Sequence, residues 1–240
     1  MISAHRGGGE TAPEGTWAAY RGALLVGADY LEFDVRATAD GTLVAHHRER
    51  LRSGRPVAAM TYAELCRAAG YEVPTTLDLL TELAGRAGAH IDLKDAGAAA
   101  AIMSQALDLL SPASIIVTTR DPAAARALKR AHPAVPVGLT IGGDLLDSVR
   151  HALRQARRRS PMSRAVGWAA EVPAAQADWA AVHQRLAGAG VLTECRALGL
   201  RTMVWTVNGD DDLRSWLARR DVDVLVTDQP GRAVALRQAS

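Results

Sequence analysis

The chain has 240 residues, 48% of them hydrophobic, and its formal net charge is only +2. This length allows a sizeable core and is close to the roughly 250 residues typical of a (β/α)8 barrel. Because the charge is small and dispersed, we expect no nucleic-acid partner. The only dense basic run is Arg154–Arg159. We interpret it as the solvated end of a helix, with contact to anionic lipid or nucleic acid as the alternative.

The two cysteines, Cys66 and Cys195, lie far apart in the chain. They predict neither a disulfide framework nor a zinc site, and we interpret both as buried small hydrophobes. No run approaches 18 apolar residues, which argues against stable membrane insertion. The start MISAHRGG lacks the pattern of a secretory signal. These features favour a cytoplasmic protein and leave its oligomeric state open.

Short apolar or β-branched runs alternate with longer Ala-, Leu- and Arg-rich stretches along the chain. In chain order, the predicted strands are Ile2–His5, Tyr30–Val35, Leu43–His47, Ala89–Leu93, Ser114–Thr118, Val135–Leu139, Trp179–His183, Arg201–Thr206 and Val222–Thr227. The predicted helices are Trp17–Val26, Thr61–Ala69, Leu77–Arg86, Ala98–Leu110, Pro122–Ala131, Leu145–Arg158, Gly190–Leu198, Asp211–Arg219 and Gly231–Gln238. This alternation is typical of a parallel sheet with crossover helices.

The third predicted strand, Leu43–His47, follows the turn signal Asp40-Gly41, so we expect an extension beside the second strand. The remaining eight strands are the number that closes a barrel. We therefore predict an α/β fold of the (β/α)8 TIM-barrel type, formed by one domain over residues 1–240. An open doubly wound sheet is the alternative. The run Gly7–Gly9 has neither the GxGxxG spacing nor the P-loop lysine, which disfavours a nucleotide cradle.

Histidines stand where two of the predicted strands end. In a TIM barrel the carboxyl ends of the strands form the active-site face. The first strand ends at His5, and the extension of the second ends at His46 and His47. The intrinsic pKa of histidine suits acid–base work near neutral pH. Because adjacent residues of a strand point to opposite faces, at most one of His46 and His47 is expected to be catalytic.

Charged residues two positions apart occur on two further strands. Glu32 and Asp34 share one face of the second strand, and Asp92 and Lys94 share one face of the next. Adjacent carboxylates repel each other unless a cation lies between them or one is protonated. Three carboxylates, with Asp92 as the third, suit Mg²⁺ or Ca²⁺ better than zinc. Taken alone, the pair could be a solvated strand edge, but its position on a rim with Arg6 and Lys94 favours a phosphate site.

The sequence resembles the glycerophosphodiester phosphodiesterase family, members of the phosphatidylinositol-phospholipase-C-like TIM barrels. The resemblance covers nearly the whole chain. It rests on the segments AHRGGGETAPEGT, LEFDV, DGTLVAHH, VPTTLDLL, HIDLK, VWTVN and VDVLVTDQP. It implies a barrel that cleaves phosphodiesters with a divalent cation, Mg²⁺ or Ca²⁺.

The resemblance also implies roles for individual residues. The family's two catalytic histidines correspond to His5 and His47. Its three metal carboxylates correspond to Glu32, Asp34 and Asp92. Its substrate-binding residues correspond to Arg6, Glu14, Lys94 and Trp205.

The sequence departs from the family pattern at several positions. The segment PENT reads Pro-Glu-Gly-Thr here, with Gly15 in place of Asn. Arg48 replaces the aspartate of the H-D pair, and Asp92 replaces a glutamate, as in sphingomyelinase-D-like enzymes. The residues after the fourth barrel strand are Thr119-Arg120 in place of the frequent Ser-Phe. Arg48 and Arg120 either favour a more anionic substrate or are simply solvated.

The resemblance implies hydrolysis of small glycerophosphodiesters to glycerol 3-phosphate and an alcohol. The family precedent implies attack by the substrate's own hydroxyl, followed by opening of a cyclic phosphate by water. One alternative is a lipid phosphodiesterase of the lysophospholipase-D or sphingomyelinase-D type, but the polar loop Arg48–Arg55 lacks the apolar rim that such an enzyme needs. The other alternative is a non-catalytic phosphate-binding barrel, which would have lost a ligand.

Overall fold

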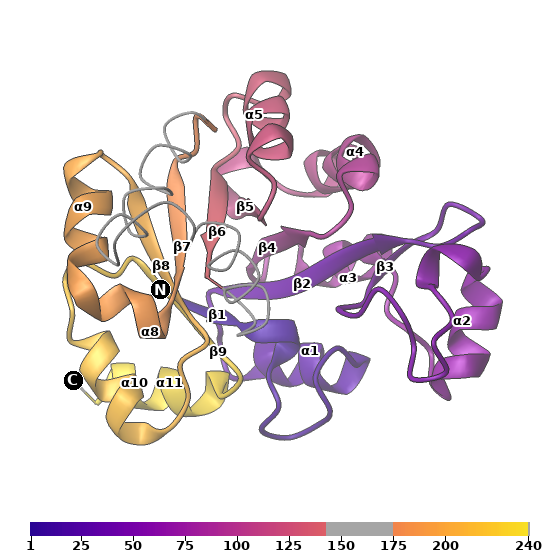
Figure 1. Ribbon diagram of the computed structural model, residues 1–240. Helices are drawn as coiled ribbons and strands as arrows, with labels where there is room; N and C mark the ends of the chain where they lie inside the picture. The colour runs from indigo at the N-terminus through magenta and orange to yellow at the C-terminus, as the bar shows by residue number, and fades with distance from the viewer. Residues whose placement is uncertain (143–174, 240) are drawn as a thin grey trace, which may run out of the picture.

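The strands close into a parallel barrel with one antiparallel extension (Figure 1). The computed structural model describes residues 1–142 and 175–239. The strands are β1 (Ile2–Ala4), β2 (Tyr30–Ala37), β3 (Leu43–Ala45), β4 (Gly88–Leu93), β5 (Ile115–Thr119), β6 (Val137–Ile141), β7 (Trp179–His183), β8 (Arg201–Trp205) and β9 (Val224–Thr227). Their order is β1-β9-β8-β7-β6-β5-β4-β2, and β1 also pairs with β2, which closes the sheet. β3 pairs antiparallel with β2, so both the predicted barrel and its extension are confirmed.

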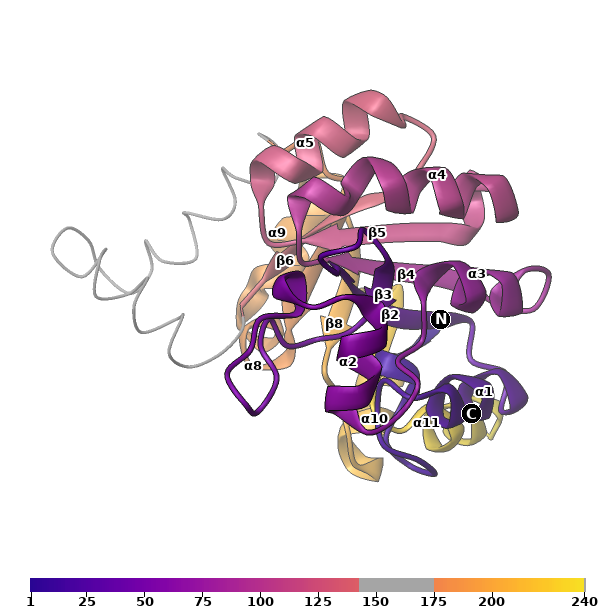
Figure 2. The ribbon, with the colours of Figure 1, turned by 90° about the vertical axis from the view of Figure 1, so that its right-hand side faces the viewer.

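The helices surround the barrel and complete the α/β alternation (Figures 1 and 2). They are α1 (Trp17–Leu25), α2 (Tyr62–Ala69), α3 (Thr76–Leu83), α4 (Ala99–Leu109), α5 (Pro122–Ala131), α8 (Gln184–Leu186), α9 (Leu192–Ala197), α10 (Asp210–Leu217) and α11 (Pro230–Gln238). The first helix, α1, lies beside the last, α11, in both views. Across the described ranges, no helix has the length and apolar character needed to cross a bilayer.

Several boundaries differ from the prediction; β3, for example, ends at Ala45 and not at His47. β6 begins two residues later than expected, at Val137, because Pro136 has no N–H to donate to a strand ladder. The helix expected from Gly190 begins at Leu192, after a π-type turn over Ala187–Val191. The first strand stops at Ala4, and residues 5–7 form a 3₁₀ turn. The predicted helix 145–158 and the basic run 154–159 lie outside the described residues.

The alternation of side chains along β2 and β4 sends their charged residues into the barrel. On β2, Leu31, Phe33 and Val35 are fully buried in the core shared with the surrounding helices. On β4, Ala89, Ile91 and Leu93 belong to that same core. Because successive strand residues point to opposite faces, the residues between them face the barrel interior. This geometry places Glu32, Asp34, His90 and Asp92 on one inner surface.

Residues 43–73 form a side lobe next to the end of β2, which Figure 1 shows at the right. The lobe contains β3, a 3₁₀ turn over Val57–Ala59, and α2. It has a separate small core of Val44, Val57, Met60, Leu65 and Val73. A capping box starts α2: the Thr61 side chain accepts from the Glu64 N–H, and the Glu64 carboxylate accepts from the Thr61 N–H. The pairing of β3 with β2 joins this lobe to the barrel.

Candidate active site

The turn that follows β1 sets the position of the first site residues. Arg6 has a φ of 50°, and Gly7 and Gly8 also have positive φ values. A Cβ at Gly7 would lie 2.7 Å from the backbone nitrogen of Tyr20, so only glycine allows this turn to pack on α1. The turn directs the Arg6 N–H to Glu32 Oε2, 2.8 Å away. The glycines of the HRGG segment therefore allow the turn that positions Arg6 beside Glu32.

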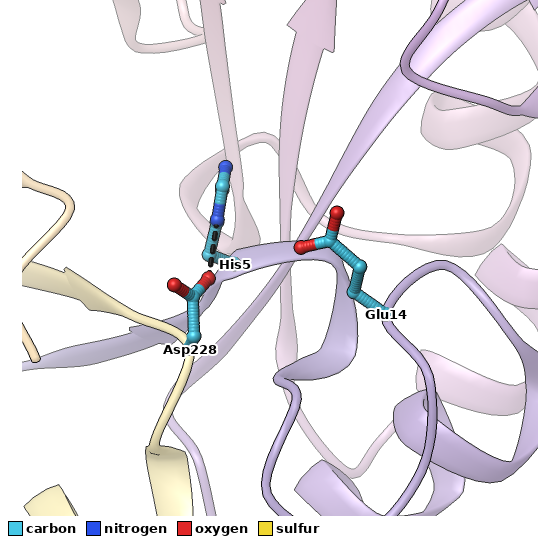
Figure 3. A group of neighbouring side chains, drawn as sticks. All are labelled: His5, Glu14 and Asp228. Carbon is cyan, nitrogen blue, oxygen red and sulfur yellow. Dashed lines mark hydrogen bonds and ion pairs between the residues drawn. The ribbon is translucent and has the colours of Figure 1, made fainter.

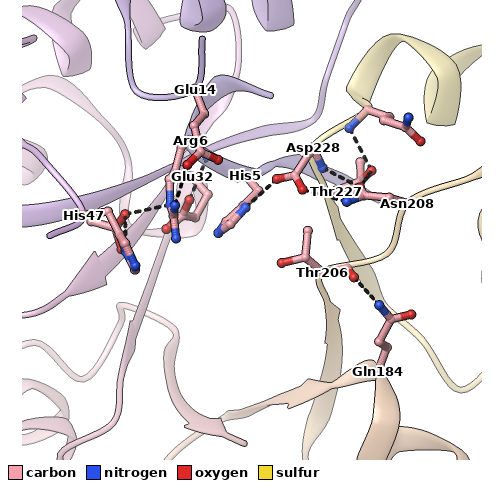
Figure 4. Close-up of polar contacts among 12 residues, drawn as sticks. His5, Arg6, Glu14, Glu32, His47, Gln184, Thr206, Asn208, Thr227 and Asp228 are labelled. Atoms are coloured by element: carbon pink, nitrogen blue, oxygen red, sulfur yellow. Dashed lines mark hydrogen bonds and ion pairs between the residues drawn. The ribbon is translucent and has the colours of Figure 1, made fainter. Parts of the chain in front are cut away.

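His5 is held by a carboxylate from the other end of the chain (Figure 3). Its Nδ1 lies 2.6 Å from Asp228 Oδ1. The Asn208 amide donates to Asp228 Oδ2 at 2.6 Å, which fixes this carboxylate in turn (Figure 4). Burial lowers the pKa of His5, but the Asp228 hydrogen bond and the charge of Glu32 outweigh it and raise that pKa overall. The contact with Asp228 leaves Nε2 of His5 as the atom available for proton transfer.

The sequence prediction missed Asp228 and Asn208. Asp228 directly follows β9, which is the same signal that singled out the residues after the other strands. Asn208 follows β8 and also accepts from the backbone N–H of Asp228 at 2.9 Å. Asp228 and Asn208 together hold His5 in place, although both are far from His5 in the sequence.

Three carboxylates converge on the inner surface of the barrel. Ligand oxygens of Glu32, Asp34 and Asp92 all lie within 4.8 Å of one another. Glu32 and Asp34 are only 3% and 2% exposed. Burial and the neighbouring Asp34 charge raise the pKa of Glu32. Burial would also raise the pKa of Asp34, but His47, Lys94 and Arg6 lower it well below its usual range.

This carboxylate group fits a hard divalent cation. The Asp92 Oδ1 atom is buried and has no hydrogen-bond partner in the described part of the chain. A buried, unpaired carboxylate oxygen is costly unless a cation or donor satisfies it. His5, Glu14 and Asp228 form a second group with the same spacing (Figure 3). There, however, His5 pairs with Asp228, and Glu14 accepts from Arg6 at 2.8 Å. The oxygen-only group is therefore the candidate metal site.

Two cationic side chains border the carboxylates. Lys94 Nζ lies 2.9 Å from Asp34 Oδ1 and 2.5 Å from Asp92 Oδ2. Burial lowers the pKa of Lys94, but the charges of Asp92 and Asp34 outweigh burial and raise it. Arg6 Nε lies 3.0 Å from Asp34 Oδ2 without the alignment of a hydrogen bond. Both cations therefore stay charged at the edge of the carboxylate group.

The adjacent histidines His46 and His47 have different surroundings. His47 Nδ1 lies 3.1 Å from Asp34 Oδ2, and the His47 side chain is 42% exposed. His46 Nδ1 instead lies 2.8 Å from the backbone oxygen of Arg48. His47 also borders the pocket that contains His5, whereas His46 does not. Only His47 is placed to act with His5.

One pocket brings most of the predicted site residues together. The predicted site residues in its lining are His5, Arg6, Glu32, His47, Asp92, Lys94 and Trp205. Asp34 lies buried beside this lining, and Glu14 borders an adjoining cleft that shares Arg6 and His47 with the pocket. Trp205 is fixed by its indole N–H, which donates to the backbone oxygen of Ala181 at 2.9 Å. The His183 ring meets the Trp205 ring edge-on, with centroids 4.9 Å apart.

A buried histidine that the sequence prediction did not single out also lines the pocket. His90 Nδ1 is 3.0 Å from Ser3 Oγ, and its Nε2 is 3.1 Å from Thr118 Oγ1. Burial lowers the pKa of His90 to about 3, so its ring is neutral near pH 7. With both ring nitrogens bound to neighbouring hydroxyls, His90 supports the pocket without a free atom for proton transfer.

The sequence is similar to known proteins over nearly its whole length. The family model for the glycerophosphoryl diester phosphodiesterase family matches residues 5–232. A glycerophosphodiester phosphodiesterase of Caldanaerobacter subterraneus subsp. tengcongensis is 24% identical over 258 residues, which span 98% of this chain and 97% of that protein.

Solved structures show the same barrel. The crystal structure of a glycerophosphodiester phosphodiesterase from Agrobacterium tumefaciens is 25% identical, with a TM-score of 0.74 over 99% of this chain and 98% of that one. An Oleispira antarctica phosphodiesterase in complex with the product sn-glycerol-3-phosphate is 18% identical, with a TM-score of 0.75 over 99% of this chain and 96% of that one. Because the family match spans nearly the whole chain, this protein belongs to the glycerophosphoryl diester phosphodiesterase family, whose members are phosphoric diester hydrolases.

Proposed function

We propose that the protein hydrolyses small glycerophosphodiesters to glycerol 3-phosphate and an alcohol with the help of a divalent cation. The observation that carries this proposal is one pocket that brings His5 and His47, the cationic Arg6 and Lys94, and the three-carboxylate group together. The bound product of the Oleispira antarctica relative supports the choice of substrate. The match over residues 5–232 supports one catalytic domain spanning residues 1–240.

Glu32, Asp34 and Asp92 would hold the cation, Mg²⁺ or Ca²⁺, because they offer only oxygen ligands. Such a cation, when bound, stabilises the negative charge that develops on a phosphoryl group during displacement. The unpaired Asp92 Oδ1 atom and the raised pKa of Glu32 are both features that a cation would relieve. These two features therefore favour the binding of a cation by the three carboxylates.

Arg6 and Lys94 would bind the phosphoryl oxygens. Both are held at the pocket edge by carboxylates, so their side chains are oriented before substrate arrives. Charge-assisted hydrogen bonds from these groups strengthen as charge accumulates on the phosphoryl oxygens. The Glu14 contact holds the Arg6 guanidinium from the exposed side. Trp205 would form the wall against which the glycerol moiety packs.

His5 and His47 would move the protons. Both border the same pocket, and each is held through Nδ1 by a carboxylate, Asp228 for His5 and Asp34 for His47. This arrangement leaves the two Nε2 atoms for the reaction. One histidine would take the proton from the attacking hydroxyl, and the other would give a proton to the leaving alcohol. The Asp228 carboxylate favours the imidazolium form of His5, because it raises the pKa of that ring.

The test is the release of glycerol 3-phosphate from glycerophosphocholine and glycerophosphoglycerol, each measured with EDTA and with added Mg²⁺ or Ca²⁺. We expect turnover that EDTA abolishes and that one of the two cations restores. Lysophosphatidylcholine serves as the lipid comparison. Activity on the lipid alone would overturn the proposed substrate class. No metal-dependent turnover of any of the three would overturn the proposed function.

A further inference from the structure

A second cleft, of about 750 Å³, opens directly beside the catalytic pocket. The two share Arg6 and His47, so a substrate bound at the pocket edge reaches both. The side lobe contributes most of the cleft's lining, including Leu51, Tyr71 and three arginines. The arginines are Arg48, Arg50 and Arg52. We call this space the arginine cleft.

The loop that presents these arginines is a hairpin with a defined backbone. The Leu51 N–H donates to the Arg55 oxygen at 3.0 Å, and the Val57 N–H donates to the Glu49 oxygen at 2.9 Å. Leu51 is half-buried and packs against the small core of the side lobe. These contacts hold the backbone of the loop in place, so the arginines are displayed by a formed structure.

The charge in the cleft is unbalanced. Arg48 and Arg52 have exposed side chains that form no hydrogen bond or ion pair with any other described residue. Arg50 donates to the backbone oxygen of Gly54 and lies 3.8 Å from Glu49. Among the described residues, Glu14 is the only carboxylate that lines the cleft, and it is already paired with Arg6. The arginine cleft therefore has an excess of positive charge, and it lies beside the catalytic pocket.

We propose that the arginine cleft receives the leaving alcohol and selects diesters whose alcohol carries a second anionic group, such as another phosphate diester. This inference rests on the proposed function, because it assumes that the scissile phosphoryl group binds at Arg6 and Lys94. His47 lies at the junction of pocket and cleft, so an alcohol leaving past it enters the cleft that Arg48 lines. Arginine recognises phosphate oxygens with directed, charge-assisted hydrogen bonds.

The experiment compares two soluble substrates that share the scissile glycerophosphoryl group. Glycerophosphoglycerol has a neutral leaving alcohol, whereas 1,3-bis(glycerophospho)glycerol has a leaving alcohol with a second phosphate diester. We expect kcat/KM per scissile bond to be about tenfold higher for the second substrate at low ionic strength, mainly through KM. Because exposed charges are screened by salt, this ratio should shrink toward one at about 0.5 M NaCl.

The double variant R48Q/R52Q removes the two unpaired charges, and R67Q serves as the matched control. Arg67 is an exposed arginine of α2 that does not line the cleft. We expect the double variant to bring the ratio of the two kcat/KM values to within about twofold of one. The control should keep the wild-type ratio. Melting temperatures verify that each variant is folded.

The possible outcomes separate the two proposals. Turnover of both substrates by the wild type with a ratio near one, or with a ratio that salt does not change, overturns the anionic subsite and leaves the proposed function intact. No turnover of either substrate overturns the proposed function itself. A folded double variant that keeps the tenfold ratio shows that these arginines do not select the alcohol.

Discussion

The two sides of the barrel interior have opposite chemical character. The wall formed by β1, β2, β4 and their following turns carries His5, Glu32, Asp34, Asp92 and Lys94. The facing wall, formed largely by β7, β8 and β9, is apolar where it lines the pocket. It contributes Ala181, Met203, Trp205 and Val226.

This difference suits the two walls to different roles in the proposed reaction. An apolar wall excludes water and lowers the effective dielectric constant, which strengthens interactions among the charges that face it. In the proposed reaction the charged wall would act on the phosphoryl group and its protons, and the apolar wall would position the rest of the substrate. We expect substitutions on the charged wall to reduce turnover by orders of magnitude, and those on the apolar wall to affect mainly KM.

The largest effect is expected from Asp34→Asn. The Asp34 carboxylate contacts Arg6, Lys94 and His47, so its loss removes one of the proposed metal ligands and the counter-charge of two cations. We expect kcat/KM for glycerophosphoglycerol to fall by at least about 10³-fold. The variant should also bind Mg²⁺ or Ca²⁺ more weakly by calorimetry. Activity within tenfold of wild type would contradict the proposed carboxylate site.

Removal of either proposed catalytic histidine should have the next largest effect. We expect His5→Ala and His47→Ala each to slow turnover by about 10²- to 10⁴-fold, the usual contribution of a general acid or base. His132→Ala is the matched control, because His132 lies at the end of α5 and does not border the pocket. Near-normal turnover in both catalytic variants would disprove their assignment.

Asp228→Asn tests the support behind His5. Because the Asp228 carboxylate raises the pKa of His5, its neutralisation should lower that pKa. The limb of the kcat/KM profile that reports His5 should therefore move to lower pH, whichever proton-transfer role His5 has. We expect a loss of about 10- to 10²-fold in kcat at pH 7. A reduced rate with an unshifted pH profile would indicate a merely structural role for Asp228.

The smallest effect is expected on the apolar wall. Trp205→Leu keeps an apolar surface but loses the indole N–H that donates to Ala181 and the ring contact with His183. We expect KM to rise by up to about tenfold while kcat changes by less than about threefold. A loss in kcat as large as that of the histidine variants would erase the distinction between the two walls.

Local patterns in the sequence were enough to predict the barrel and the composition of its charged wall. The two-residue spacing of Glu32 and Asp34 and the buried residues between them determine which face of β2 they occupy, since the pleat alternates sides whatever the rest of the fold. The same rule places Asp92 on the inner face of β4. Strand ends that carry titratable residues then meet at one rim because parallel strands share a direction.

Tertiary structure alone decided the partners of these residues. The His5–Asp228 contact joins positions separated by 223 residues and exists because β1 pairs with β9 when the barrel closes. The arginine cleft likewise depends on how the side lobe packs beside β2. Side-chain alternation is a local property of a strand, and so the sequence shows it. Which charges approach one another depends on ring closure and packing between distant elements, and no local pattern encodes that.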